Sequence, residues 1–177
     1  MAKKGLVGSY VPSQLTIAIS HPQTNSNFIL AGYTEDSIIS VERENPTWES
    51  TEGADGYHQR THRLSKTVRI TVSLLQVSEY NDFLSGLVMY DENDLRGGGL
   101  FTCTVADKSG RSYAMSNQAY VVEPSSYESS QTATSRDWVI VLPYADHYIG
   151  GNVPITVEQQ EQLARLGVVI EDDWIRG

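Results

Sequence analysis

Two alternating segments, separated by a long polar insertion, constrain the fold of this chain most strongly. In residues 37–75, Ile39 and Val41 alternate with polar residues, and so do the apolar residues from Val68 to Leu74. Alternation with a period of two places one set of side chains against a core and the other toward water. The segment therefore predicts two amphipathic strands. Their polar faces are formed by Ser40, Glu42, Glu44, Thr67, Arg69, Thr71 and Ser73.

The insertion between these strands, residues 50–65, is polar and contains Gly53 and Gly56. Hairpin connections usually take about two to five residues, and longer ones are commonly functional or disordered. We therefore expect a loop that becomes ordered against a partner.

The rest of the chain predicts more strands and one long helix. Strand-like segments cover residues 14–20, 28–31, 100–105, 111–116, 118–122 and 137–142. From Ser78 to Asn93 the apolar spacing is helical, with Ser78, Asn81 and Asp82 as a capped start. The expected fold is mainly β: a two-sheet sandwich or partly open barrel with one flanking α-helix. Residues 1–152 would form this domain with an N-terminal arm, and residues 153–177 a C-terminal extension, with a short helix capped by Thr156 and ended by Gly167.

Charge and composition exclude several classes of protein. The 177 residues carry 22 acidic against 13 basic side chains, a net charge of −9, which argues against a surface that grips DNA. An acidic surface is nevertheless suited to DNA that must pass without sticking. No apolar run is long enough for a membrane helix, and the N-terminus lacks the apolar core of a secretory signal, so we expect synthesis in the cytoplasm. Cys103, inside an apolar run, is expected to be a buried structural residue.

No set of residues predicts catalysis or a metal site. His58 and His62 lie four apart, a zinc-binding spacing on a helix, but Gly53 and Gly56 favour solvated loop residues. The acidic run 91–94 lacks the central glycine and final glutamate of a calcium loop, and the glycines 97–99 lack the context of a phosphate-binding loop. We expect no enzyme activity and no cofactor.

Several short motifs together resemble one known family. They are the runs 4–13 (KGLVGSYVPS), 39–43 (ISVER) and 53–56 (GADG), Arg60, Arg63, the strand 68–75 with Gln76, then Ser78, Asn81, Leu84-Ser85 and Gly150-Gly151-Asn152. This pattern resembles the tail tube proteins of contractile-tailed bacteriophages over residues 4–152. Residues 153–177 depart from it.

The resemblance implies an architecture and a set of partners. Subunits would form hexameric rings that stack into a tube, each lending strands to an inner β-barrel whose channel is lined by the polar faces named above. The insertion would reach the adjacent ring, where Asp55 could pair with Arg60 or Arg63 of another subunit. DNA and the tape measure protein would pass through the channel, and the sheath, baseplate and terminator proteins would contact the tube of the virion tail. The residues expected to make contacts between rings are Glu52, Asp55, His58, Arg60, His62 and Arg63.

Two alternatives remain open from the sequence. One is another β-rich tail component, such as a tail terminator or a baseplate hub protein. The other is a soluble ligand-binding or hydrolytic β-sandwich that uses His58, His62 and the nearby acidic residues.

Overall fold

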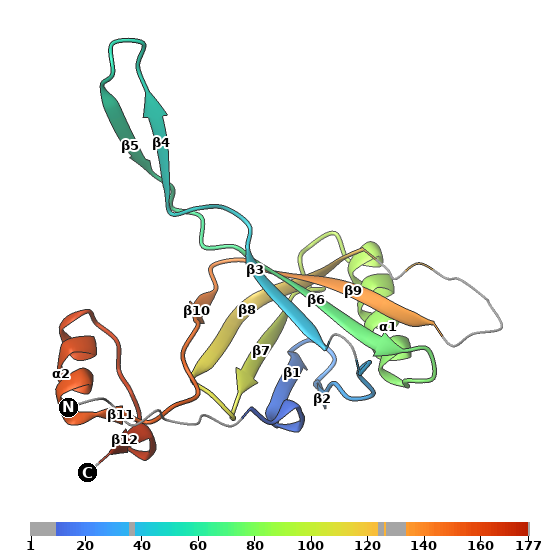
Figure 1. Ribbon diagram of the computed structural model, residues 1–177. Helices are drawn as coiled ribbons and strands as arrows, with labels where there is room; N and C mark the ends of the chain where they lie inside the picture. The colour runs from blue at the N-terminus through green and yellow to red at the C-terminus, as the bar shows by residue number, and fades with distance from the viewer. Residues whose placement is uncertain (1–9, 36–37, 124–125, 127–133, 177) are drawn as a thin grey trace.

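The computed structural model describes residues 10–35, 38–123, 126 and 134–176 (Figure 1). The predicted N-terminal arm lies mostly outside these residues. The described elements, in chain order, are η1 (Pro12–Gln14), β1 (Leu15–His21), β2 (Ser26–Ile29), β3 (Ile39–Arg43), β4 (Trp48–Glu52), β5 (His58–His62), β6 (Val68–Leu75), α1 (Tyr80–Asn93), β7 (Phe101–Asp107), β8 (Ser112–Glu123), β9 (Ser135–Leu142), β10 (Asp146–Tyr148), β11 (Ile155–Thr156), α2 (Val157–Arg165), η2 (Asp172–Trp174) and β12 (Ile175–Arg176).

One eight-stranded antiparallel sheet forms the body of the protein. Its order is β2-β1-β7-β8-β9-β6-β3, and β10 pairs with the first part of β8. Strand β8 belongs to two halves of the sheet, because it pairs with β7 over residues 112–119 and with β9 from Tyr120 onward. The register shifts in β8 between Val121 and Glu123, an irregularity typical of a bend in a sheet. The mainly β fold with two packed half-sheets and a flanking helix is therefore confirmed, and the described strands form no closed barrel.

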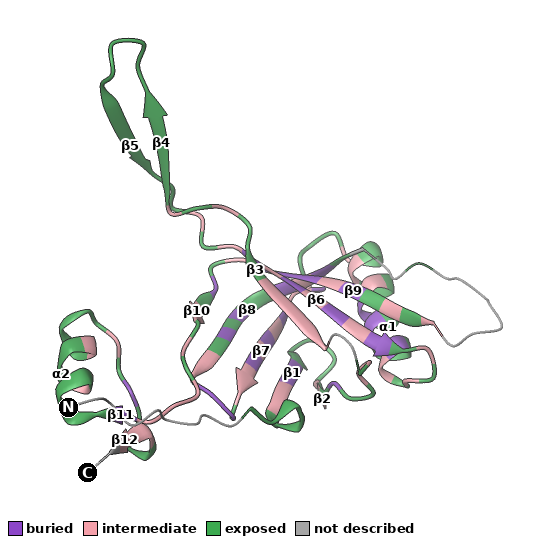
Figure 2. Cartoon of the chain, in the orientation of Figure 1, coloured by how far each residue is buried: buried purple, intermediate pink, exposed green. Residues whose placement is uncertain are grey.

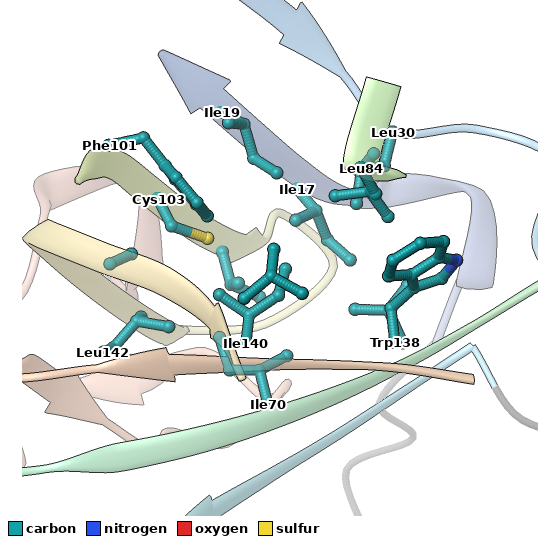
Figure 3. Packing of buried hydrophobic residues seen from close by; sticks show 14 of the residues in the cluster. Ile17, Ile19, Leu30, Ile70, Leu84, Phe101, Cys103, Trp138, Ile140 and Leu142 are labelled. Carbon is teal, nitrogen blue, oxygen red and sulfur yellow. The ribbon is translucent and has the colours of Figure 1, made fainter. Parts of the chain in front are cut away.

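The two half-sheets face each other across a single apolar core. Ile17 of β1, Ile70 of β6 and Ile140 of β9 are each fully buried in one cluster. Figure 3 shows side chains from these strands, from β7 and from α1 pointing into the same interior. The inward residues are those that the alternating pattern predicts, since β6 buries every second residue from Val68 to Leu74. Period-two alternation therefore specifies which face of each strand is buried.

The chain between β2 and β3 links the two ends of the curved sheet. The Leu30 amide donates a hydrogen bond to the Ile17 carbonyl (2.9 Å) on the β1 side. Two residues later, the Gly32 carbonyl accepts from the Leu75 amide (2.8 Å) at the end of β6. This short crossing holds the sheet in a nearly closed shape. The outer edge of β3 has no strand partner among the described residues.

Helix α1 is anchored to the core by a buried hydrogen bond. The Trp138 indole Nε1 donates to Asn81 Oδ1 (3.0 Å), and both side chains are buried. Asn81 Nδ2 donates in turn to the carbonyls of Leu75 (3.0 Å) and Ser78 (2.9 Å). The prediction that Ser78 caps the helix is wrong, because its hydroxyl donates to the Ala31 carbonyl and α1 begins after Glu79 without a side-chain cap.

The C-terminal residues form a two-stranded sheet of their own. Strands β11 and β12 pair in parallel, and α2 lies between them in the chain. The predicted cap is confirmed: the Gln159 amide donates to Thr156 Oγ1, and the Gln159 side chain accepts from the Thr156 amide, a complete capping box. Gly167 follows the helix at φ +82°, a conformation in which glycine carries no steric penalty.

We expect replacement of Asn81 by alanine to lower the free energy of unfolding by about 1–3 kcal/mol, because the buried Trp138 N–H loses its acceptor. Urea denaturation measures this change. The control is Asn93→Ala on the same helix, whose exposed side chain bonds only the Met89 carbonyl; we expect a change within about 0.5 kcal/mol. Equal effects of the two substitutions would contradict a special role for Asn81.

Burial of Cys103 predicts a loss of stability in alkaline solution. Burial raises the pKa of its thiol from 9.0 to about 12. Above pH 9 the unfolded chain releases this proton while the folded chain retains it, so the free energy of unfolding falls as the pH rises, by up to about 1.4 kcal/mol per pH unit. Urea denaturation from about pH 8 to pH 10 should show a shallower fall for Cys103→Ala than for the parent. Parallel slopes would mean that the thiol ionises equally well in the folded protein.

Candidate functional site

The insertion in the middle of the chain is an ordered β-hairpin. Strands β4 and β5 pair antiparallel, with Trp48 opposite His62 and Glu52 opposite His58. At the tip the Gly53 amide donates to the Tyr57 carbonyl (2.8 Å), and Gly56 takes a positive φ of +83°. The expectation of a loop that becomes ordered only against a partner is therefore wrong, because the strands pair within the single chain. The two glycines serve the turn of a five-residue tip, and the polar residues on either side form strands.

The hairpin stands away from the body of the protein (Figure 1). Every residue of β4 and β5 is exposed (Figure 2). Large apolar side chains in and beside it are exposed too: Tyr57 at the tip by 79% and Leu64 at its base by 84%. Because a lone two-stranded hairpin is only marginally stable in water, this element has the properties of a surface that packs against another molecule.

The two faces of the hairpin differ in chemistry. The face that we call the Trp48 face consists of Trp48, Ser50, Glu52, His58, Arg60 and His62. On it the Arg60 guanidinium lies 4.2 Å from the centre of the Trp48 ring, and the His62 ring meets the same indole edge-on at 4.8 Å. Stacked tryptophan and arginine side chains are frequent energetic centres of protein interfaces. On the opposite face, Arg63 forms an ion pair with Glu49 (2.6 Å).

All six residues predicted to contact another ring lie in the hairpin or at its base. They are Glu52, Asp55, His58, Arg60, His62 and Arg63. Within the chain, His58 lies 3.7 Å from Glu52, and both are largely exposed. Pairing of Asp55 with Arg60 or Arg63 of another subunit stays a prediction, and a pair with Arg63 would compete with Glu49 for the same guanidinium. The sequence analysis missed Glu49 and did not include Trp48 among the residues expected to make contacts between rings.

The residues predicted to line a channel share one outward sheet face. Ser40 lies opposite Thr71, and Glu42 lies opposite Arg69, in the β3–β6 register. Arg69 forms an ion pair with Glu44 (3.3 Å). The other two residues of this set are Thr67, immediately before β6, and Ser73 within β6. Both alternate with the buried residues of β6.

Strand β9 extends this polar face with a residue that the sequence analysis missed. Asp137 lies opposite Ser73 and accepts a hydrogen bond from its hydroxyl (2.6 Å). The sequence signal for Asp137 was its position immediately before Trp138, because neighbouring residues of a strand point to opposite faces. Three carboxylates and one guanidinium therefore give this face a net negative charge: Glu42, Glu44, Asp137 and Arg69.

The remaining candidate residues form no metal-binding cluster in the part of the chain that is described. There, no three His, Cys, Asp or Glu side chains gather in a way that could hold a metal ion. Neither of the two α-helices found there has the length and apolar content required to cross a bilayer.

Comparison with known proteins identifies a relative that matches nearly the whole chain. No family model matches the sequence. Over 172 residues the chain is 38% identical to structural protein ORF10 of Pseudomonas phage KPP10, an alignment that covers 97% of this chain and 99% of that protein. The chain therefore belongs to this family of bacteriophage structural proteins.

We expect the isolated protein to exchange the amide hydrogens of its hairpin far faster than those of β6. The hairpin opens without exposing any core, so its opening should cost no more than about 2 kcal/mol, whereas the β6 amides should need nearly global unfolding. Hydrogen exchange with mass spectrometry measures both. Trp48→Ala should speed hairpin exchange further while changing global stability by less than about 0.5 kcal/mol. Thr61→Ala, on the other face, is the control, and equal protection of both regions would contradict the prediction.

Proposed function

We propose that this phage structural protein is the tail tube protein of a contractile tail, in which six copies form a ring and the rings stack around a channel. The observation that carries the proposal is the exposed hairpin, which has the properties of an interface yet packs against no other described part of its own chain. A stacking contact between rings would supply its missing partner. The resemblance of residues 4–152 to tail tube proteins supports the same reading.

Ring formation would satisfy the open edges of the main sheet. Strands β2 and β3 lie at opposite ends of its order, and neither has a second strand partner among the described residues. Unpaired edges invite pairing with another chain. A head-to-tail contact between two different edges generates a ring when the rotation closes. Pairing of β3 in one copy with β2 in the next would thus continue the sheet around a hexamer.

The polar face of β3, β6 and β9 would line the channel. Its carboxylates Glu42, Glu44 and Asp137 repel the phosphates of DNA, and the whole chain carries a net charge of −9. Such a bore lets DNA and the tape measure protein slide through without binding. The role is mechanical, so the proposal includes neither a catalytic residue nor a cofactor.

The C-terminal unit would be an addition to the tube-forming domain of residues 1–152. Arg111, at the start of β8, ties it to the body: Nη1 donates to the Val153 carbonyl (2.9 Å), and the guanidinium lies 5.0 Å from the Trp174 ring centre. Among the residues of this segment whose burial is described, only Ile155 and Ile170 are buried. We place this extension, residues 153–177, on the outside of the tube, where the sheath protein would contact it. The baseplate and terminator proteins would meet the two ends of the tube in the virion.

Replacement of the hairpin tests the proposed stacking. The Arg63 amide donates to the Thr47 carbonyl (2.9 Å), so the two ends of the hairpin lie close together. A short Gly-Ser linker can therefore replace residues 48–62 without straining the body. We expect a folded protein with unchanged core stability that forms no tubes at concentrations where the parent does. Circular dichroism and negative-stain electron microscopy measure the two properties.

The outcome of this experiment also separates the alternatives. Stacked rings of the parent support a tube, whereas single rings that never stack point to a terminator or hub protein. Normal tubes from the linker variant would overturn the role of the hairpin.

A further inference from the structure

A groove on the exposed side of α1 has the features of a docking site. It has a volume of roughly 520 Å³ and lies between α1 and the β1–β2 hairpin. Phe28 of β2 stacks on Phe83 of α1, with ring centres 5.0 Å apart. Phe83 is 48% exposed, so this aromatic wall faces solvent in the single chain.

Two carboxylates flank the aromatic wall. Glu79 and Asp82 both line the groove and are exposed. Neither forms an ion pair with any residue that the structure describes. Gly86, which also lines the groove, leaves it open, since a side chain there would meet no neighbouring atom. The groove thus combines an apolar wall with unpaired negative charge.

A buried hydrogen-bond donor lines the same groove. His21 is fully buried, and its Nδ1 accepts a hydrogen bond from the Thr24 amide (3.2 Å). The proton therefore sits on Nε2, which is buried and has no hydrogen-bond partner among the described residues. A buried donor left unpaired costs free energy, so the base of the groove is a polar point beneath its aromatic wall.

We propose that this α1 groove receives the Trp48 face of the hairpin from a second copy of the chain. The inference rests on the proposed stacking of rings and names the surface that accepts the hairpin. A second copy is required because the hairpin points away from α1 within its own chain (Figure 1).

The chemistry of the two surfaces is complementary. Arg60 forms no ion pair with any described residue of its own chain, and the groove offers Glu79 and Asp82. The Trp48 indole matches the exposed aromatic wall. The cation and the aromatic ring of the hairpin therefore each find a counterpart in one groove.

A charge-swap experiment on the full-length chain tests the pairing. We expect two variants to raise the concentration needed for tube assembly by about tenfold or more: Arg60→Glu, and the double variant Glu79→Lys/Asp82→Lys. Each variant places like charges in contact between the hairpin and the groove. The triple variant that combines all three changes should bring that concentration back to within about threefold of the parent. Light scattering and electron microscopy measure assembly, and thermal unfolding checks that each variant folds.

Matched controls distinguish docking from a general effect of charge. Gln59→Glu adds a negative charge to the opposite hairpin face, and Glu92→Lys adds a positive charge to α1 outside the groove; both should assemble like the parent. If the groove variant assembles normally while Arg60→Glu does not, the hairpin docks elsewhere and this inference fails, although the proposed tube stands. If the parent forms no tubes at all, the proposed function itself fails. If tube assembly by the triple variant is as impaired as assembly by Arg60→Glu or by Glu79→Lys/Asp82→Lys, the proposed pairing is also overturned.

Discussion

Packing of two half-sheets around one apolar interior is the interaction on which the rest of this structure depends. Strand β8 makes it possible, because it pairs with β7 along its first part and with β9 beyond the bend. The inward side chains of both halves then meet in a single cluster. Burial of this apolar surface is the dominant favourable term in folding, and it gives the outward faces and edges a rigid support. The crossing at residues 30–34 and the Asn81–Trp138 hydrogen bond hold the sheet and the helix around that interior.

The hairpin is held in shape by interactions other than apolar burial. It buries nothing, and its contacts are local: ladder hydrogen bonds, the Trp48–Arg60 stack and the Glu49–Arg63 ion pair. Exposed ion pairs contribute little, so these contacts hold a shape without adding much stability. Such an element has the properties of a contact surface. In the tube that we propose, each hairpin would be buried against a neighbouring copy.

Much of the fold and part of the candidate site could be predicted from the sequence. Alternation in residues 67–75 identified β6 and its buried face, and the helical spacing after Ser78 identified α1. The sequence of β4 and β5 shows no alternation of apolar and polar residues, because strands exposed on both faces do not need it. Their polar residues were therefore interpreted as a loop. The role of Asn81 was also beyond sequence reasoning, since its partner Trp138 lies 57 positions away. The α1 groove is assembled from β1, β2 and α1 and has no continuous motif.

The sequence by itself determined the class of fold, the inward face of each core strand, the polar face of β3 and β6, and the cap and end of α2. Each of these depends on local spacing or on a few neighbouring residues, which physical chemistry translates directly into structure. Only the tertiary structure decided the strand order, the ordering of the insertion into a hairpin, and the meeting of Phe28, His21 and Glu79 in one groove. These features depend on contacts between distant residues, and nothing in the local pattern specifies which distant segments will share a core.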